Sequence, residues 1–486
     1  MKNLNLCSGP QSEGGKNMGL RRDSLKACPR EKKSMTLQKL FDLDSPRNGA
    51  SKLARSSNGS PRKECQDSEN EEIFSLIPHC SVFYTFNNPQ ESPSQQDLKR
   101  LKLIQLLSII KCSKTAFNRE VLSSVFSMLS ANLFRPLPPS KTSLICILPD
   151  DDELVATPSA AWSHLQIVFD IFHRLLLKTD PKELREYIDH SFLVNLLSLF
   201  RSEDPKERES LKNVCHQIYS KFTFYRSFMR KAMNDVFLHY IFEADQHHCG
   251  IGDLLEIWGS IINGFTVPLK QEHKLFLTRV LIPLHKPKGM QAYHRQLAYC
   301  VSQFVHKDAA LGGTVVRGML RYWPVTNCQK EVLLIGELED VVENIDPEHY
   351  RTIALPLCTQ ITKCLNSWNS QVAERGLYVW NNEQFVKMAS QAMEDVLPVV
   401  VRGMEKNLKY HWSNSVKQLT QNVKEMLQGL EPSLYIRCLS RLALEESAAQ
   451  HREMTRKEMW ERVEMAAATR NQCVHQLRCI CVSSYD

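Results

Sequence analysis

Residues 250–285 constrain the fold most, because their apolar residues recur at a helical period and are interrupted once by residues that end helices. The first apolar stripe consists of Leu254, Trp258, Ile261, Ile262 and Phe265. Such spacing places the side chains on one face of an α-helix, which must then be buried. Gly264 and Pro268 end this helix, and the pattern starts again at Leu275. The stretch therefore predicts an antiparallel pair of helices.

The same pattern continues along most of the chain, with breaks about every 15 to 20 residues. Two helices per about 40 residues is the period of HEAT and armadillo-type arrays. Such units bury their apolar faces only by stacking on their neighbours. Glycine is scarce at 18 of 486 residues, and long alternating apolar and polar runs are rare. We therefore predict an all-α fold, a HEAT-like (armadillo-type) helical-repeat solenoid that forms a curved superhelix, although no residue signature repeats between the units.

Composition divides the chain into a tail, a repeat region and a second tail. Residues 1–70 are rich in Ser, Asn, Gly, Lys and Arg and poor in aromatic residues, which predicts a disordered basic tail. The repeat region is expected over residues 71–471, beginning with an extended segment from Glu71 to about Phe86. A Pro-rich, acidic insertion at residues 135–158 is expected to be a loop. Residues 398–408, 432–444 and 447–467 are predicted as separate helices, and residues 472–486 as a short C-terminal tail.

The net charge of +7 is concentrated in the tail. Residues 1–70 contain 14 Lys and Arg against 8 Asp and Glu, which leaves the repeat region nearly neutral. A basic surface for nucleic acid is therefore not expected there. The chain also has no run of 18 or more apolar residues, so no membrane span is predicted.

Three serines in the tail are candidate phosphorylation sites. Ser24 follows two arginines, and Ser45 and Ser60 each precede a proline with an arginine just beyond. A mobile, basic segment of this kind is accessible to kinases. Short patterns in a Ser-rich tail also arise by chance, so this assignment stays a hypothesis.

The 16 cysteines are interpreted as reduced thiols. Several fall inside helical patterns, and the start of the chain has no apolar signal segment, so we expect a protein of the cytoplasm and/or nucleus. Two groups contain the residue types that bind zinc: His247, His248 and Cys249, and then Cys473, His475, Cys479 and Cys481. Neither has the spacing of a metal site, so no metal and no cofactor are predicted. Nucleophile elbows, phosphate-binding glycine loops and His-Glu-x-x-His helices are missing as well, so no catalytic residues are assigned.

Several blocks of sequence, in one order, resemble a known family. They are FRSEDPKER at 200–208, LEIWGSIINGF at 255–265, PLKQEHKL at 268–275, QLAYCV at 296–301, YWPV at 322–325 and QVAERGLYVWNNE at 371–383. Together they are similar to the B-prime regulatory subunits of heterotrimeric serine/threonine protein phosphatase type 2A, and HKPK at 285–288 and YWPVTN at 322–327 most resemble plant members. The resemblance implies an eight-repeat solenoid without catalytic groups that binds a scaffold subunit and a catalytic subunit.

The resemblance also implies a concave groove for short acidic-hydrophobic peptides of the Leu-x-x-Ile-x-Glu type in substrate proteins. Carried over by position, this groove consists of His216, Gln217, Tyr219, Arg226, Ile257, Ile261, Lys270 and His273. Tyr219, Ile257 and Ile261 would receive the peptide isoleucine, and Lys270 and His273 its glutamate. Arg230, four residues after Arg226, would extend the positive charge.

Gln217 departs from the family pattern, which has an arginine after the position of His216. Glutamine retains hydrogen bonding and loses the charge, so we expect peptide affinity about tenfold lower, or a changed motif. Alternatives stay open at this point. Ile257 and Ile261 are compatible with simple core positions.

The function of the whole chain has two alternatives as well. One is a HEAT-type cargo or transport adaptor that binds peptides but no phosphatase. The other is an enzyme, which would require turnover by the chain alone.

Overall fold

The computed structural model describes residues 62–86, 91–113, 116–137, 161–243 and 248–482. Within these ranges the secondary structure is helical, and the predicted helical-repeat solenoid is confirmed. The predicted disordered tail up to residue 61, with its three candidate phosphorylation sites, and most of the predicted insertion loop lie outside the described residues. Residues 62–482 belong to a single compact unit with one continuous hydrophobic core.

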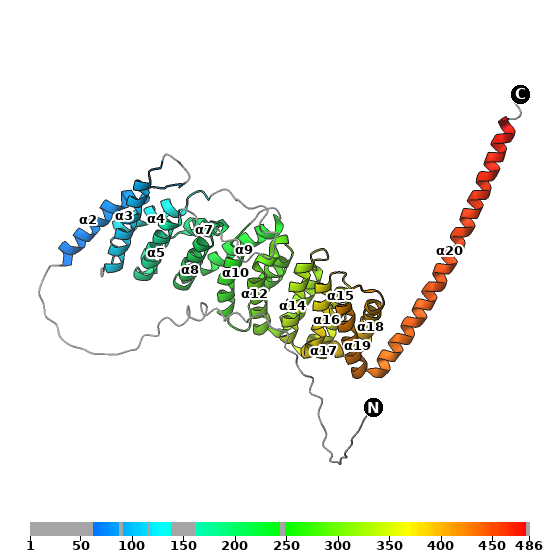
Figure 1. Ribbon diagram of the computed structural model, residues 1–486. Helices are drawn as coiled ribbons and strands as arrows, with labels where there is room; N and C mark the ends of the chain where they lie inside the picture. The colour runs from blue at the N-terminus through cyan, green and yellow to red at the C-terminus, as the bar shows by residue number, and fades with distance from the viewer. Residues whose placement is uncertain (1–61, 87–90, 114–115, 138–160, 244–247, 483–486) are drawn as a thin grey trace, which may run out of the picture. The chain divides into compact units, whose positions relative to one another are not determined.

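The helices of this unit alternate between two layers, and neighbours within each layer pack side by side (Figure 1). The first layer contains α3 (Pro93–Cys112), α5 (Trp162–Lys178), α8 (Pro205–Lys221), α10 (Ile251–Asn263), α12 (His294–Lys307), α14 (Cys328–Glu343), α16 (Ser370–Tyr378) and α19 (Asn414–Leu430). The second layer contains α2 (Arg62–Ser81), α4 (Arg119–Leu133), α7 (His190–Ser198), α9 (Arg226–Phe242), α11 (Gln271–Phe276), the π-helix η4 (Leu277–Leu281), α13 (Gly312–Arg321), α15 (Tyr350–Leu365), α18 (Met393–Tyr410) and α20 (Pro432–Val482). The short helices α6 (Pro181–Leu184) and α17 (Glu383–Ser390) complete the described α-helices.

A lysine near the end of a first-layer helix repeatedly binds the last carbonyl groups of the preceding helix in that layer. Lys178 Nζ donates to the carbonyl oxygen of Ser113 at 2.8 Å, Lys221 Nζ to that of Leu176 at 2.6 Å, and Lys307 Nζ to those of Asn263 and Phe265 at 3.0 Å. The last carbonyls of a helix have no partner within the helix, and its dipole favours a cation there. These lysine clamps tie successive repeats together and supply the repeated feature that the sequence pattern did not reveal.

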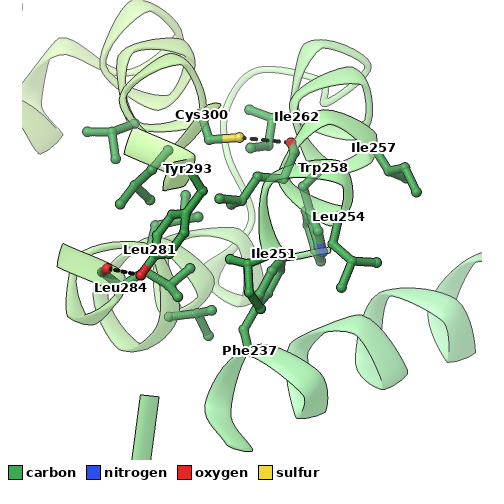
Figure 2. Packing of buried hydrophobic residues seen from close by; sticks show 14 of the residues in the cluster. Phe237, Ile251, Leu254, Ile257, Trp258, Ile262, Leu281, Leu284, Tyr293 and Cys300 are labelled. Atoms are coloured by element: carbon green, nitrogen blue, oxygen red, sulfur yellow. Dashed lines mark hydrogen bonds between the residues drawn. The ribbon is translucent and has the colours of Figure 1, made fainter. Parts of the chain in front are cut away.

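Helix α10 shows how the apolar stripes become core (Figure 2). Leu254 and Trp258 are buried, and the Trp258 ring stacks on Phe276 with 3.8 Å between ring centroids. On the other side, Cys300 Sγ of α12 donates to the Leu255 carbonyl at 3.2 Å. Gly264 follows the last helical residue, so the predicted helix end is confirmed.

The structure corrects the prediction at three helix boundaries. Helix α2 begins at Arg62, so it includes the last residues of the predicted tail, and it ends at Ser81, so it includes only the first part of the segment predicted as extended. Ile73, Leu76 and Cys80 are buried there at helical spacing. Helix α18 begins at Met393, so Pro398 lies inside it rather than at its start. The two helices predicted near the C-terminus form the single helix α20, which continues to Val482 into the predicted C-terminal tail.

Two buried polar groups cross-link the repeats. Arg135 forms a bidentate ion pair with Glu207, at 2.8 and 2.9 Å, and Ser202 Oγ donates to the same carboxylate at 2.6 Å. In the second group, Glu337 of α14 accepts from His285 Nε2 at 3.1 Å and from His294 Nε2 at 2.9 Å. We call the latter the Glu337 centre. Both groups satisfy a carboxylate that is otherwise costly to bury.

The thiols lie where the sequence suggested. Among the described residues, Cys215, Cys300, Cys358 and Cys364 are free and buried. Burial raises the pKa of the Cys364 thiol to about 12, with the Glu331 carboxylate acting in the same direction. Such thiols stay protonated and behave as small apolar side chains. None of the helices in the described part of the chain has the length and apolar character to cross a membrane.

Candidate functional site

The residues predicted for the groove come from four consecutive elements. Tyr219 lies near the C-terminal end of α8, Arg226 and Arg230 lie in the first two turns of α9, Ile261 lies on α10, and His273 lies on α11. Helix α8 packs on α10, and α9 packs on η4, which directly continues α11. The repeat stacking therefore brings these elements to one part of the molecule.

Tyr219 is the hub that joins α8 to α9. The Arg226 guanidinium donates through Nε to the Tyr219 carbonyl and through Nη2 to the Ser220 carbonyl, both at 2.9 Å, and lies 5.5 Å from the centre of the Tyr219 ring. Arg230 Nη1 donates to the Tyr219 hydroxyl at 3.1 Å. The end of a helix exposes carbonyl groups that attract cations, so the two arginines are fixed by α8 itself.

Glu272 continues this chain of contacts from α9 to α11. Its Oε1 lies 3.8 Å from Arg230 Nη2 and 3.4 Å from His273 Nε2. The Glu272 side chain is 58% exposed, whereas that of His273 is 10% exposed. Tyr219 thus joins Arg226 and Arg230 directly, and Glu272, which the sequence did not single out, links Arg230 to His273.

His273 is held in a fixed orientation by Phe265. The two rings are parallel, with 3.6 Å between their centroids and 1° between their planes. Burial lowers the pKa of His273, and the nearby Arg230 and Lys270 lower it further against the opposing effect of Glu272. At pH 7 this imidazole is therefore neutral. The other predicted cation at this end of the groove, Lys270, is exposed.

His216 and Gln217 lie one turn before the end of α8, and both are half-buried. Burial lowers the pKa of His216, so it too is neutral at pH 7. Gln217 Oε1 is buried and has no hydrogen-bond partner among the described residues. The arginine that the family pattern has at this position would bring a charge, and Gln217 brings an unused acceptor instead.

Ile257 and Ile261 belong to the hydrophobic core, with 1% and 6% of their surface exposed. Figure 2 shows Ile257 among the buried side chains around α10. The cause is that α10 packs against first-layer helices on two sides, α8 and α12, and buries most of its circumference. The core position that the sequence left open as an alternative describes both residues, and their contact with a peptide stays a prediction.

The first sequence group with zinc-binding residue types lies partly within the described residues. The described residues contain no group of three or more His, Cys, Asp or Glu arranged to hold an ion. The Nδ1 atom of His248 accepts from the Gly250 N–H at 3.2 Å, which is a local turn contact. His247 and the side chains of the second cysteine and histidine group lie outside the described residues.

Glu272 and Phe265 are the residues that sequence reasoning missed. Phe265 was assigned only to an apolar stripe, and Glu272 was passed over because the predicted groove called for cations. One available signal was the position of Glu272, directly beside His273 in the first turn of a helix.

A surface hollow of about 430 Å³ between α13 and α15, lined by Leu320, Leu355 and Lys363 among others, was not predicted either.

The fold and this site define the class of the protein: an all-α helical-repeat protein with a polar cluster built across consecutive repeats. Residues 60–467 match the family model described as protein phosphatase 2A regulatory B subunit (B56 family). The chain therefore belongs to this family of regulatory subunits, which is distinct from the catalytic subunit of the phosphatase.

Individual relatives agree with the family match. The chain is 42% identical over 406 residues to the eta isoform of the 59 kDa regulatory B' subunits of serine/threonine protein phosphatase 2A in Arabidopsis thaliana, over 83% of this chain and 79% of the relative. It is 43% identical to the 57 kDa B' beta isoform of the same plant, over 81% of this chain and 80% of the relative. Identity to the 57 kDa B' kappa isoform of Oryza sativa subsp. japonica is 39%, over 84% and 80%. The resemblance stated from the sequence is confirmed.

Proposed function

We propose that this chain, as a regulatory subunit, holds the scaffold and catalytic subunits of protein phosphatase 2A and recruits phosphoprotein substrates through the site around Tyr219. The names of the relatives support the first part. The observation that carries the second part is the convergence of Tyr219, Arg226, Arg230 and His273 from three separate elements. The cytoplasm and/or nucleus is the compartment that we propose with it.

The mechanism is an increase in effective concentration rather than chemistry by this chain. A substrate that docks a short motif on the regulatory subunit presents its phosphorylated residues to the catalytic subunit in an almost intramolecular reaction. Because the docking site is separate from the phosphate that is removed, the regulatory subunit selects substrates without touching the reacting atoms. The gain depends on the motif affinity and on the length of chain between motif and phosphosite.

We propose an acidic-hydrophobic motif of the Leu-x-x-Ile-x-Glu type as the ligand. Lys270 is the exposed cation beside His273 and supports recognition of the glutamate. The aromatic ring of Tyr219, partly buried against the core, supports recognition of the apolar residue. Gln217 removes one charge from this surface, so affinity is expected to be moderate and to increase in Gln217→Arg.

The direct test is Lys270→Glu in the full-length chain, with Lys387→Glu on an exposed face of α17 as the matched control. Loss of a charged hydrogen bond and gain of repulsion should weaken binding of a Leu-x-x-Ile-x-Glu peptide at least about tenfold in calorimetry, with no change in the control. Co-purification of the scaffold and catalytic subunits should be equal for both variants. Unchanged peptide affinity in Lys270→Glu would refute the site. Failure of the wild-type chain to retain the phosphatase subunits would favour a cargo adaptor instead.

A further inference from the structure

The cationic end of the candidate site already contains a carboxylate from the chain itself. Glu272 Oε1 lies between Arg230 Nη2 and His273 Nε2, at 3.8 and 3.4 Å. Both partner side chains are largely buried, with 23% and 10% of their surface exposed, while Glu272 is 58% exposed. Glu272 is therefore the most exposed of the three side chains, and it occupies the position at which a second carboxylate would bind both nitrogen groups.

We propose that Glu272 is a resident carboxylate that an incoming acidic side chain must displace, and that it thereby sets the affinity and the acid selectivity of the site. This inference rests on the proposed function, because it assumes that the site receives a peptide with an acidic residue. It deepens that function by assigning the control of acid recognition to a residue outside the predicted groove.

The geometry makes Glu272 replaceable. Its distances to Arg230 and His273 exceed those of a charge-assisted hydrogen bond, which are about 2.7 to 2.9 Å. Ion pairs that are open to solvent and loosely formed contribute little stability. Arg230 and His273 each have a second contact that does not involve Glu272. Arg230 donates to the Tyr219 hydroxyl at 3.1 Å, and the His273 ring stacks on Phe265. Glu272 can therefore swing away without dismantling the site.

The charge balance makes the displacement matter. Arg226 is committed to two backbone carbonyls of α8, so Arg230 and Lys270 are the cations among the predicted groove residues that are left to meet a ligand carboxylate. Gln217 contributes no charge, and His273 is neutral at pH 7. With two cations available, one internal anion cancels half of the local attraction. Glu272 is thus a stronger competitor in this chain than it would be beside an arginine at position 217.

The test measures two peptides against three forms of the full-length chain. The peptides are a Leu-x-x-Ile-x-Glu sequence and the same sequence with the final Glu replaced by Gln. The forms are the wild type, Glu272→Gln, and Glu120→Gln as a matched control, since Glu120 is also an exposed acid in the first turn of a helix. Fluorescence anisotropy should show about three- to fivefold tighter binding of the acidic peptide to Glu272→Gln, as expected for removal of one exposed charge interaction. The amide peptide should bind all three forms equally.

Each outcome decides the proposal. Equal or weaker binding of the acidic peptide by Glu272→Gln would overturn the resident-carboxylate role and leave the proposed function intact if Lys270→Glu still weakens binding at least about tenfold. An equal gain for both peptides would also overturn it, because displacement by a carboxylate requires a charged ligand. If neither the wild type nor Glu272→Gln binds the acidic peptide, the resident-carboxylate role and the proposed docking of this motif are both refuted. Binding by Glu272→Gln alone would establish the competition and show that the wild-type site is closed to this motif.

Discussion

Two histidine–glutamate pairs in this molecule have nearly the same chemistry and opposite behaviour. In the Glu337 centre, His285 and Glu337 are 0% and 2% exposed. In the candidate site, His273 and Glu272 are 10% and 58% exposed. In the first pair both ring nitrogens of the histidine are hydrogen-bonded, whereas the second pair is a contact of 3.4 Å at the surface.

The number of hydrogen-bond acceptors around each imidazole explains the difference. His285 Nδ1 donates to the Ile282 carbonyl at 2.9 Å and Nε2 donates to Glu337, so both ring nitrogens carry a proton. Burial alone would lower the pKa of His285, and the Glu337 carboxylate more than reverses this and raises it. Nδ1 of His273 has no such acceptor among the described residues, and burial prevails there. A carboxylate neighbour therefore does not by itself decide the charge of a histidine.

The largest expected effect comes from removing the charge in the buried pair. Glu337→Gln leaves the His285 imidazolium without its counter-ion in the core, which should lower the free energy of unfolding by about 3 to 5 kcal/mol. Urea denaturation followed by circular dichroism measures this loss. A decrease below about 1 kcal/mol would show that the centre rearranges easily, and the contrast between the two pairs would not hold.

The dependence of stability on pH should have opposite signs at the two histidines. The pKa of His285 is raised, so its contribution is complete below the unfolded value of about 6.5 and is lost as the pH rises through the folded pKa. The pKa of His273 is lowered, so its contribution is present above about 6.5 and is lost as the pH falls through the folded pKa.

Different charged groups face the two rings. Glu337 and Lys330 act on His285, and His294 binds the same Glu337 carboxylate. Glu272, Arg230 and Lys270 act on His273. The difference in unfolding free energy between wild type and His273→Gln, measured at several pH values between 5 and 8, should shift in favour of the wild type as pH rises. A shift in the other direction would mean that His273 is charged in the folded chain.

The Glu337 centre has an acidic limit as well, which the difference in unfolding free energy between wild type and Glu337→Gln at several pH values measures. Burial alone would raise its pKa, and His285 and His294 instead lower it to about 2. Its contribution is therefore present above the unfolded value of 4.5 and is lost as the pH falls toward about 2. The Glu337 centre should stabilise the fold most between about pH 4.5 and 6.5.

The smallest effect on stability is expected from substituting Glu272, the exposed member of the second pair. Glu272→Gln removes a solvent-exposed ion pair, so the free energy of unfolding should change by less than about 1 kcal/mol. The same urea denaturation measures it, with Glu120→Gln as the control. A loss comparable to that of Glu337→Gln would show that Glu272 is a structural residue and would argue against its displacement by a ligand.

The sequence predicted the helices well where an apolar stripe was long and its ends were marked, as around Gly264. It failed where the apolar residues were dense, as in α2, or where a proline lay inside a helix, as Pro398 does in α18. Helical periodicity depends on residues close in the chain, so these errors concern boundaries and not the class of fold. The residues of the candidate site were chosen through the family resemblance, and periodicity alone would have assigned Ile257 and Ile261 to the core.

The sequence by itself determined the all-α repeat architecture, the family and the residue types available to the site, because these follow from local periodicity and from blocks of residues in a fixed order. The tertiary structure decided which of those residues meet. Lys307 binds a carbonyl group at the end of α10, 44 positions earlier in the chain. Glu272 of α11 contacts Arg230 of α9, although the whole of α10 lies between them in the sequence. It also decided which groups are charged, since burial and neighbouring charges make the His285 ring an imidazolium and leave that of His273 neutral.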